Sequence, residues 1–418
     1  MVEILLGILL PAMLLSCGIF FIIYLRGYPL RCPKRFFKAI FRKSSGGMGA
    51  LMTALAGTLG VGNISGVAAA VTLGGAGALF WMWVCAVFAM VVKYAEIVLA
   101  LQGRGDGGGG AMYYINKRPL AVLFSVLCLA CGFSMGNLTQ VRAAGGAIAH
   151  LLPNGTLTVS LSFALILPFV LLKGKRGVFR FAEKAVPLMT AFYCILSLVF
   201  LLRNRSALPM AMKSVFKDAF STRAVGWGSA GSAWILGLRY GASRGMISNE
   251  AGCGTAPIAH AASANAPAVQ GCFGVVEVFV DTILLCTLTG LCVLISPAAL
   301  KAGDGTALVM DTFASCFGRA AEFLLAPAMV LFAFATVVCW FYYCCECLYF
   351  LINSRRYNKI LAVFFSLLCL TAPLFTEERL FLVCDLLIFS LATLNIPALF
   401  WHRKQIRRET HRYFIKTK

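Results

Sequence analysis

The chain has 418 residues, of which 60% are hydrophobic and only 13% charged, and its formal net charge is +21 at pH 7. A soluble protein of this length needs far more polar surface, so the composition excludes that class and indicates an all-α polytopic membrane protein. The basic residues stand mainly in short runs between apolar segments. This pattern is typical of membrane topology and argues against nucleic-acid binding, which needs a continuous basic domain.

Apolar stretches that approach or exceed the length of about 20 residues needed to cross a bilayer recur along the chain. They predict eleven membrane-spanning helices: one near 4–25, five near 47–73, 78–101, 119–151, 157–172 and 182–202, and five near 227–260, 268–296, 321–352, 358–375 and 380–401. Because five is odd, the second set enters the membrane from the opposite side, and the two sets are predicted to be inverted repeats.

The predicted organisation has four parts. Residues 1–45 form a peripheral N-terminal helix with a basic loop, 46–205 the first five-helix repeat, 206–402 the second, inverted repeat, and 403–418 a basic tail. If the loop at 26–43 is cytoplasmic, the cytoplasmic stretches hold 25 Lys and Arg residues and the opposite side holds 8. The positive-inside rule therefore predicts a multi-pass protein of the cell membrane with a cytoplasmic C-terminal tail.

A glycine-rich break interrupts the first helix of each predicted repeat, at 57–66 in the first repeat and at 240–254 in the second. Glycine weakens a helix and frees backbone groups to face something other than their own turn. Non-helical backbone at membrane depth is tolerated only where protein buries it or where it lines a cavity. Two such breaks in corresponding positions predict the binding site of a transporter.

The first break combines flexible backbone with polar but uncharged side chains: Gly57, Gly60, Gly62, Thr58 and Asn63. No acid or base lies between Leu51 and Trp83, so exposed N–H groups here suit a ligand that brings its own carboxylate. Freed carbonyls of the same break suit a small hard cation. The alternative is a glycine-packed helix crossing without a ligand.

Charged residues inside predicted spans are expensive and are usually paired or functional. Arg244 and Glu250 of the second break either neutralise one another as a structural lock or take part in gating. Lys93 and Glu96 lie three apart on one helix, which predicts an intrahelical ion pair near the cytoplasmic interface.

Glu277 and Asp281 form a further acidic pair, four residues apart in the predicted helix 268–296. This spacing places both carboxyl groups on one face, where they need interior partners or protonation. The structural interpretation and a proton-relay role both remain open.

Several motifs in the chain occur together and in this order: Ala54–Thr58, Gly62–Ala68, Leu73–Ala78, Phe80–Trp83, Gly109–Tyr114, Gly136–Gln140, Arg244–Gly252, Ala256–Ala261, Asp281–Thr282, Cys286–Thr289, and Trp340 with Tyr342–Tyr343. Taken together they resemble the alanine/glycine:cation symporter family, the sodium:alanine symporters. The resemblance covers most of the chain, and it implies the five-plus-five inverted repeat of the LeuT fold, in agreement with the helix count.

The resemblance also implies the function, which is sodium-coupled uptake of alanine or glycine with no cofactor beyond the co-transported sodium ion. The substrate-binding residues expected on this fold are Thr58, Gly60, Gly62, Asn63, Gln140, Ile247 and Trp340. The sodium site is expected to use carbonyls of the first break, such as that of Gly57, together with the hydroxyl of Thr336. Ile247 stands where the family usually has an aromatic residue.

Several alternatives remain open at this stage. Ala335 stands beside Thr336 where the family often has a second hydroxyl, so proton coupling is the nearest alternative to sodium coupling. A channel is a second alternative, whereas an enzyme is not expected because no nucleophile–base or zinc-type spacing is visible. The sequence leaves the exact substrate, its stereochemistry, the stoichiometry and the oligomeric state open.

Overall fold

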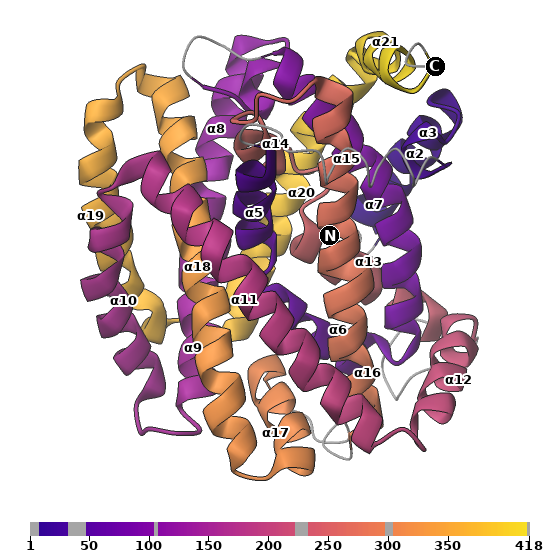
Figure 1. The fold of residues 1–418 in the computed structure, drawn as a ribbon, viewed down its shortest axis with the longest axis vertical. Helices are drawn as coiled ribbons and strands as arrows, with labels where there is room; N and C mark the ends of the chain where they lie inside the picture. The colour runs from indigo at the N-terminus through magenta and orange to yellow at the C-terminus, as the bar shows by residue number, and fades with distance from the viewer. Residues whose placement is uncertain (1–7, 32–46, 104–107, 222–232, 297–303, 416–418) are drawn as a thin grey trace.

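The computed structural model describes residues 8–31, 47–103, 108–221, 233–296 and 304–415 (Figure 1). Within these ranges seven helices are long and apolar enough to cross a membrane, or eight when the bent pair formed by α5 (Gly47–Thr58) and the segment Val61–Gly74 counts as one span. The start of the predicted first helix, most of the basic loop at 26–43 and residues 227–232 of the second broken helix lie outside the described residues.

The helices of the first half are α2 (Leu10–Tyr24), α3 (Tyr28–Arg31), α5, α6 (Ser65–Gly74), α7 (Gly77–Gln102), α8 (Arg118–Phe133), α9 (Thr139–Ile148), α10 (Gly155–Leu171) and α11 (Gly174–Arg203). The second half contains α12 (Leu208–Ala219), α13 (Ala233–Asn249), α14 (Ala256–His260), α15 (Pro267–Val278), α16 (Thr287–Ile295), α17 (Gly305–Phe317), α18 (Ala320–Ile352), α19 (Asn358–Leu368), α20 (Glu377–Trp401) and α21 (Arg403–Phe414).

Each predicted span has a helix, or a pair of helices, in its place. The all-helical membrane architecture is confirmed, while the count of eleven stays a prediction because α2 and α10 are short for a span. Helices α12, α17 and α21 occupy stretches that the sequence analysis treats as connections or tail. Helix α21 forms there because Ile406, Thr410 and Phe414, four apart, give it one face to bury.

The broken helices lie in the middle of the bundle, with α5 and α6 between α13 and α18 (Figure 1). Helix α13 packs closely on α7: a Cβ added at Gly241 would lie 2.3 Å from the carbonyl oxygen of Ala78. Only glycine permits this approach, as is common between helices in membranes. The centre of the bundle is therefore held by backbone contacts as well as by side chains.

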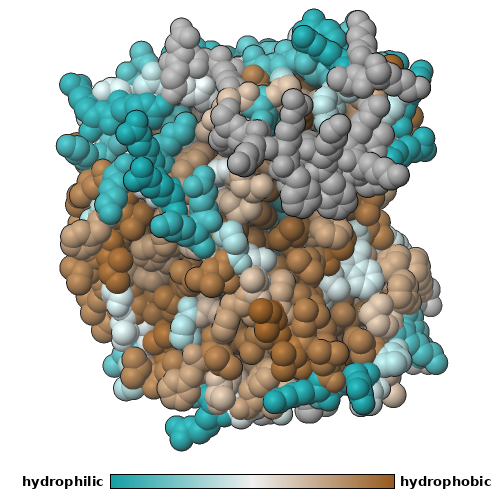
Figure 2. Space-filling model, viewed as in Figure 1, coloured by the Kyte–Doolittle hydropathy of each residue, from teal (hydrophilic) through white to brown (hydrophobic). Residues whose placement is uncertain are grey.

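Apolar side chains cover the middle of the face shown in Figure 2, and hydrophilic side chains gather at its two ends. On the bundle surface, Leu165 and Phe169 of α10 and Ile195 of α11 are 71%, 68% and 62% exposed. Such an extent of exposed apolar surface is expected for a protein surrounded by lipid.

Two of the long helices contain a π-helical segment in their middle. Ser134–Leu138 joins α8 to α9, and Phe279–Cys286 joins α15 to α16. A π-helical turn accommodates an extra residue and is found most often at functional sites. Phe279–Cys286 contacts the short 3-10 turn Val61–Asn63 of the first break, and so does α9, which directly follows Ser134–Leu138.

Candidate functional site

The first break has a steric reason for its central glycine. Helix α5 ends at Thr58, and the segment that follows is bent away from it by 60°. A Cβ added at Gly60 would lie 2.7 Å from Oε1 of Gln140 and 2.8 Å from Oγ1 of Thr336. Both distances are shorter than real contacts of this kind, so the break can close around these two side chains only with glycine at position 60.

Side-chain acceptors occupy two of the backbone N–H groups that the break frees. The N–H of Val61 donates to Oε1 of Gln140 at 3.1 Å, and that of Gly60 donates to Oδ1 of Asn63 at 3.2 Å. The amide of Gln140 also donates to the carbonyl of Met135 at 3.0 Å. These N–H groups were predicted to be exposed, whereas Gln140 and Asn63 cover them in the structure.

The second break is a turn of left-handed backbone between α13 and α14. Glu250, Gly252 and Gly254 have φ angles of +54°, +87° and +77°. Oε1 of Glu96 accepts the N–H of Gly254 at 2.9 Å and also the side-chain amide of Asn395, which donates in addition to the carbonyl of Gly252 at 2.9 Å. The turn is thus anchored to α7 and α20.

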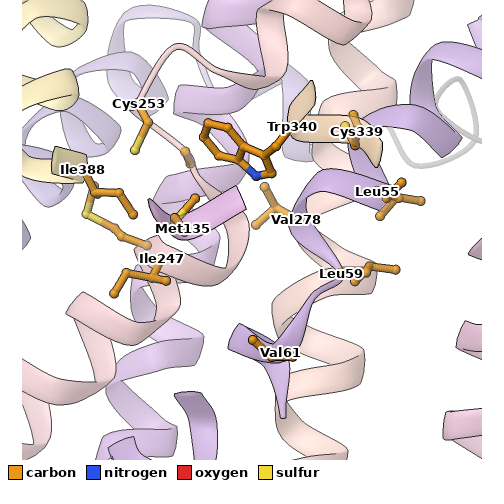
Figure 3. Packing of buried hydrophobic residues seen from close by; sticks show 14 of the residues in the cluster. Leu55, Leu59, Val61, Met135, Ile247, Cys253, Val278, Cys339, Trp340 and Ile388 are labelled. Atoms are coloured by element: carbon orange, nitrogen blue, oxygen red, sulfur yellow. The ribbon is translucent and has the colours of Figure 1, made fainter. Parts of the chain in front are cut away.

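A cavity of about 10 Å³ lies between the two breaks. Its lining comes from α5, the two breaks, α9, the π segment before it, α13, α18 and α20: Gly57, Thr58, Gly60, Val61, Gly62, Met135, Thr139, Gln140, Ile247, Glu250, Trp340 and Phe381. Figure 3 shows Trp340, Met135 and Ile247 on three of these elements. The volume is about that of one water, so the walls must separate when a larger molecule enters.

Six of the seven residues predicted to bind substrate line this cavity, namely Thr58, Gly60, Gly62, Gln140, Ile247 and Trp340. The seventh, Asn63, lies behind it. Val61, Met135, Thr139 and Phe381 also line the cavity and were not predicted from the sequence. Thr139 could have been predicted, because it precedes Gln140 in the motif Gly136–Gln140. No feature of the sequence singles out Phe381.

Two polar atoms of the cavity lining have no hydrogen-bond partner among the described residues. One is the donor Nε1 of Trp340, whose side chain is fully buried, and the other is the acceptor Oε1 of Glu250. The Trp340 ring is held against the π segment Ser134–Leu138, since a Cβ added at Gly136 would lie 2.3 Å from its Cγ. Buried polar atoms are nearly always paired, so this donor and this acceptor are available to a ligand.

A cluster of oxygens surrounds Thr336 of α18. Its hydroxyl lies 3.0 Å from the carbonyl oxygen of Ala56, 3.1 Å from that of Phe332 and 3.5 Å from that of Leu59. The hydroxyl has one hydrogen and can donate it to only one of these three carbonyl oxygens. The cluster therefore has more oxygens than donors, which suits a hard cation. The break carbonyls that contact Thr336 come from Ala56 and Leu59, whereas the Cα of Gly57 faces Cys339, whose sulfur would lie 3.0 Å from an added Cβ.

A buried carboxylate joins the two breaks. Oδ1 of Asp281 accepts the amide of Asn63 at 2.6 Å, and its Oδ2 accepts the hydroxyls of Ser248 at 2.8 Å and Thr282 at 2.7 Å. These donors come from the first break, from α13 and from the π segment itself. Asp281 therefore accepts hydrogen bonds from both breaks, and its bond to Asn63 explains why Asn63 points away from the cavity.

The predicted Lys93–Glu96 ion pair is not formed. Nζ of Lys93 lies 3.1 Å from Oε1 of Glu277 on α15, and both side chains are fully buried. Glu277 also lies 3.0 Å from Nε2 of His260, while Glu96 turns to the second break. A buried lysine is destabilising unless a carboxylate pairs with it inside the protein. Glu277 of α15 is that partner.

The predicted Arg244–Glu250 pair is also not formed. Nη1 of Arg244 lies 3.5 Å from Oδ1 of Asp385, and its guanidinium stacks over the Phe381 ring at 4.6 Å. Glu250 instead accepts a hydrogen bond from Thr255. Helix α13 ends at Asn249 and Glu250 already has left-handed backbone, so Arg244 and Glu250 face different neighbours.

A second cavity, of about 440 Å³, lies beyond Phe381 on the side of α17. Its charged lining residues are Arg142, Arg244, Asp304, Glu377 and Glu378. Phe381 lines both cavities, so its ring is part of the wall between them. Arg142 donates to the carbonyl of Phe375 at 3.1 Å and to the hydroxyl of Thr156 at 3.0 Å.

The whole chain, residues 1–418, matches the sodium:alanine symporter family. The chain belongs to this family. The sodium/alanine symporter AgcS of Methanococcus maripaludis is 37% identical over 73% of this chain and 70% of its own length. An uncharacterized transporter of Haemophilus influenzae is 33% identical over 99% of this chain and 94% of its own length.

Because the chain belongs to this family, it is a secondary transporter and not an enzyme. More specifically, it is a cation-coupled amino acid transporter. A crystal structure of MhsT in complex with L-phenylalanine superposes with a TM-score of 0.59 at 15% identity, covering 87% of this chain and 97% of that one. This likeness shows the shared LeuT fold, as the family resemblance predicted.

Proposed function

We propose that the protein takes up a small neutral amino acid, alanine or glycine, together with sodium by alternating access. The supporting observation is the pair of unpartnered atoms in one small cavity, Nε1 of Trp340 and Oε1 of Glu250. The ammonium group of an amino acid can pair with Glu250, and its carboxylate can accept the Nε1–H of Trp340. The carboxylate can also accept the N–H of Val61 once Gln140 has released that N–H. The apolar walls formed by Met135 and Ile247 favour a short side chain.

Sodium binds, in this proposal, among the oxygens of Ala56, Leu59 and Thr336. The first break then offers N–H groups to the substrate and carbonyl groups to the cation within a few residues. Each ligand stabilises the same closed shape of the break, so each increases the affinity of the other. This reciprocity is the physical basis of the proposed coupling.

Access from the outside is controlled, in this proposal, by Phe381 and by the Arg244–Asp385 contact that holds it. The 440 Å³ cavity is then the outer vestibule. This assignment agrees with the predicted cytoplasmic tail, because α21 and α17, whose Gly305 lines the cavity, lie at opposite ends of the molecule (Figure 1). Opening of the gate requires Arg244 to leave the Phe381 ring.

Uptake of labelled alanine into proteoliposomes tests the proposal. An inward sodium gradient is expected to accumulate alanine above its equilibrium level, and replacement of external sodium by choline at fixed pH is expected to abolish accumulation. Liposomes in which a sodium ionophore has collapsed the gradient are the control. Absence of accumulation under both a sodium and a proton gradient refutes the proposal, and current without accumulation indicates a channel.

Proton coupling is the second candidate, and the contacts of Asp281 favour it. This buried carboxylate accepts hydrogen bonds from both breaks and forms no ion pair with a cation among the described residues. Protonation would weaken these bonds and loosen one break from the other. If a proton gradient drives accumulation in choline and Asp281→Asn abolishes it, the coupling ion is the proton.

A further inference from the structure

A pocket of about 790 Å³ is lined by residues of α21 and by the last residue of α2, two helices that lie at the same end of the molecule (Figure 1). Its basic lining residues are Lys404, Arg407, Arg408, Arg412 and His411. Tyr24, the last residue of α2, forms part of the opposite wall. The proposed transport pathway uses none of these residues.

The fold itself directs this basic face outward. Ile406, Thr410 and Phe414 form the buried face of α21. Thr410 receives a hydrogen bond from the buried Tyr94 of α7 at 3.1 Å, and Phe414 stacks on Tyr28 with ring centroids 5.8 Å apart. The remaining faces of α21, which carry the arginines, consequently border the pocket.

The positive charge of the pocket is barely neutralised. Among the described lining residues Glu409 is the only acid, and it lies 3.7 Å from Arg408. Burial lowers the pKa of His411 from its ordinary value, and the positive charges of Arg407 and Arg26 lower it further. Nε2 of His411 is buried and has no hydrogen-bond partner among the described residues. The pocket thus combines several cations with an unsatisfied polar atom.

The surroundings of the pocket place it at the boundary between hydrocarbon and headgroups. Ile23, next to Tyr24, is 72% exposed, and Ile19 one turn earlier is also exposed, so α2 presents an apolar strip below the pocket. Trp401, the last residue of α20, is 74% exposed. Exposed tryptophan and tyrosine at helix ends mark the membrane interface, and hydrophilic side chains gather at this end of the face shown in Figure 2.

We infer that this pocket binds the headgroup of an anionic phospholipid, whose acyl chains lie along the exposed strip of α2. Basic pockets at the membrane surface bind such headgroups, and arginine pairs well with phosphate because its guanidinium donates two parallel hydrogen bonds. Arg407 is already oriented by stacking over the Tyr24 ring at 5.1 Å. The lipid would clamp α21 against α2 and so hold the C-terminal helix in place.

The test uses the full-length protein in nanodiscs of phosphatidylcholine, alone or with half of it replaced by phosphatidylglycerol. Native mass spectrometry then counts phosphatidylglycerol molecules retained by the released protein, and thermal unfolding is followed in the same discs. The variant is Arg407→Gln combined with Arg412→Gln. The matched control is Arg356→Gln, because Arg356 is also exposed and stacks on a tyrosine, Tyr357, but lies outside the pocket.

The wild type and the control are expected to retain phosphatidylglycerol and to unfold at higher temperature when it is present. Each basic residue near an anionic surface strengthens binding about fivefold, so the double variant is expected to bind about thirtyfold more weakly. Equal retention by the double variant and the control overturns the inference. A stabilisation by inorganic phosphate in phosphatidylcholine discs equal to that by phosphatidylglycerol also overturns it, because the pocket would then recognise a soluble anion.

Discussion

Replacing Gly60 by alanine perturbs the proposed substrate and cation sites together. The new methyl would lie 2.7 Å from Oε1 of Gln140 and 2.8 Å from Oγ1 of Thr336. Gln140 is flexible and can rotate away, which breaks its bond to the N–H of Val61. Thr336 is β-branched and sits in the middle of α18, so the backbone of the break must move instead. Overpacking of this kind costs about 1–3 kcal/mol, or about 5-fold to 150-fold in an equilibrium constant.

The expected result for Gly60→Ala is therefore a loss of apparent affinity for both alanine and sodium within that range. Concentration dependence of uptake in proteoliposomes measures both, and the melting temperature reports folding. The matched control is Gly66→Ala in the adjoining α6, where the nearest atom, in the Phe381 ring, would be 3.9 Å from the new Cβ. Wild-type affinities in Gly60→Ala, or equal losses in both variants, would refute the steric reasoning.

Three further variants address other contacts. Gln140→Ala removes a cavity-lining amide that is free to bind the substrate once it has left the Val61 N–H, and is expected to lower alanine affinity in equilibrium binding by about tenfold, with the melting temperature little changed. Lys93→Met leaves Glu277 buried without its lysine and is expected to cost about 3–5 kcal/mol in thermal unfolding, and the double variant with Glu277→Gln should recover part of this loss. Phe381→Ala removes the ring under Arg244 and is expected to speed release of labelled alanine about 2-fold to 30-fold.

The sequence predicts those features of the site that have local causes. Clustered glycines in an apolar stretch identify both breaks, and apolar run lengths locate the long helices. The substrate residues are different, because the family resemblance supplies Gln140 and Trp340, which lie far from the breaks along the chain. The structure then places both side chains on one cavity.

The ion-pair partners of the buried charged residues could not be predicted from the sequence. Spacing on one helix suggests Lys93–Glu96, yet the partner of Lys93 is 184 residues away. Arg244 likewise pairs across the bundle with Asp385. Only packing decides which carboxylate a buried cation reaches. Phe381 is one of 33 phenylalanines in the chain, and nothing local separates it from the others.

The number of residues in the π-helical segment Ser134–Leu138 determines how Gln140 is oriented toward the site. Deleting one of its residues would restore a regular α-helix and turn all that follows by about 100° relative to what precedes. Gln140 would then leave Val61, although no lining residue had changed. Insertions and deletions are therefore far less tolerated at this position than substitutions, and relatives that differ in nearly every residue of this helix should still align here without a gap.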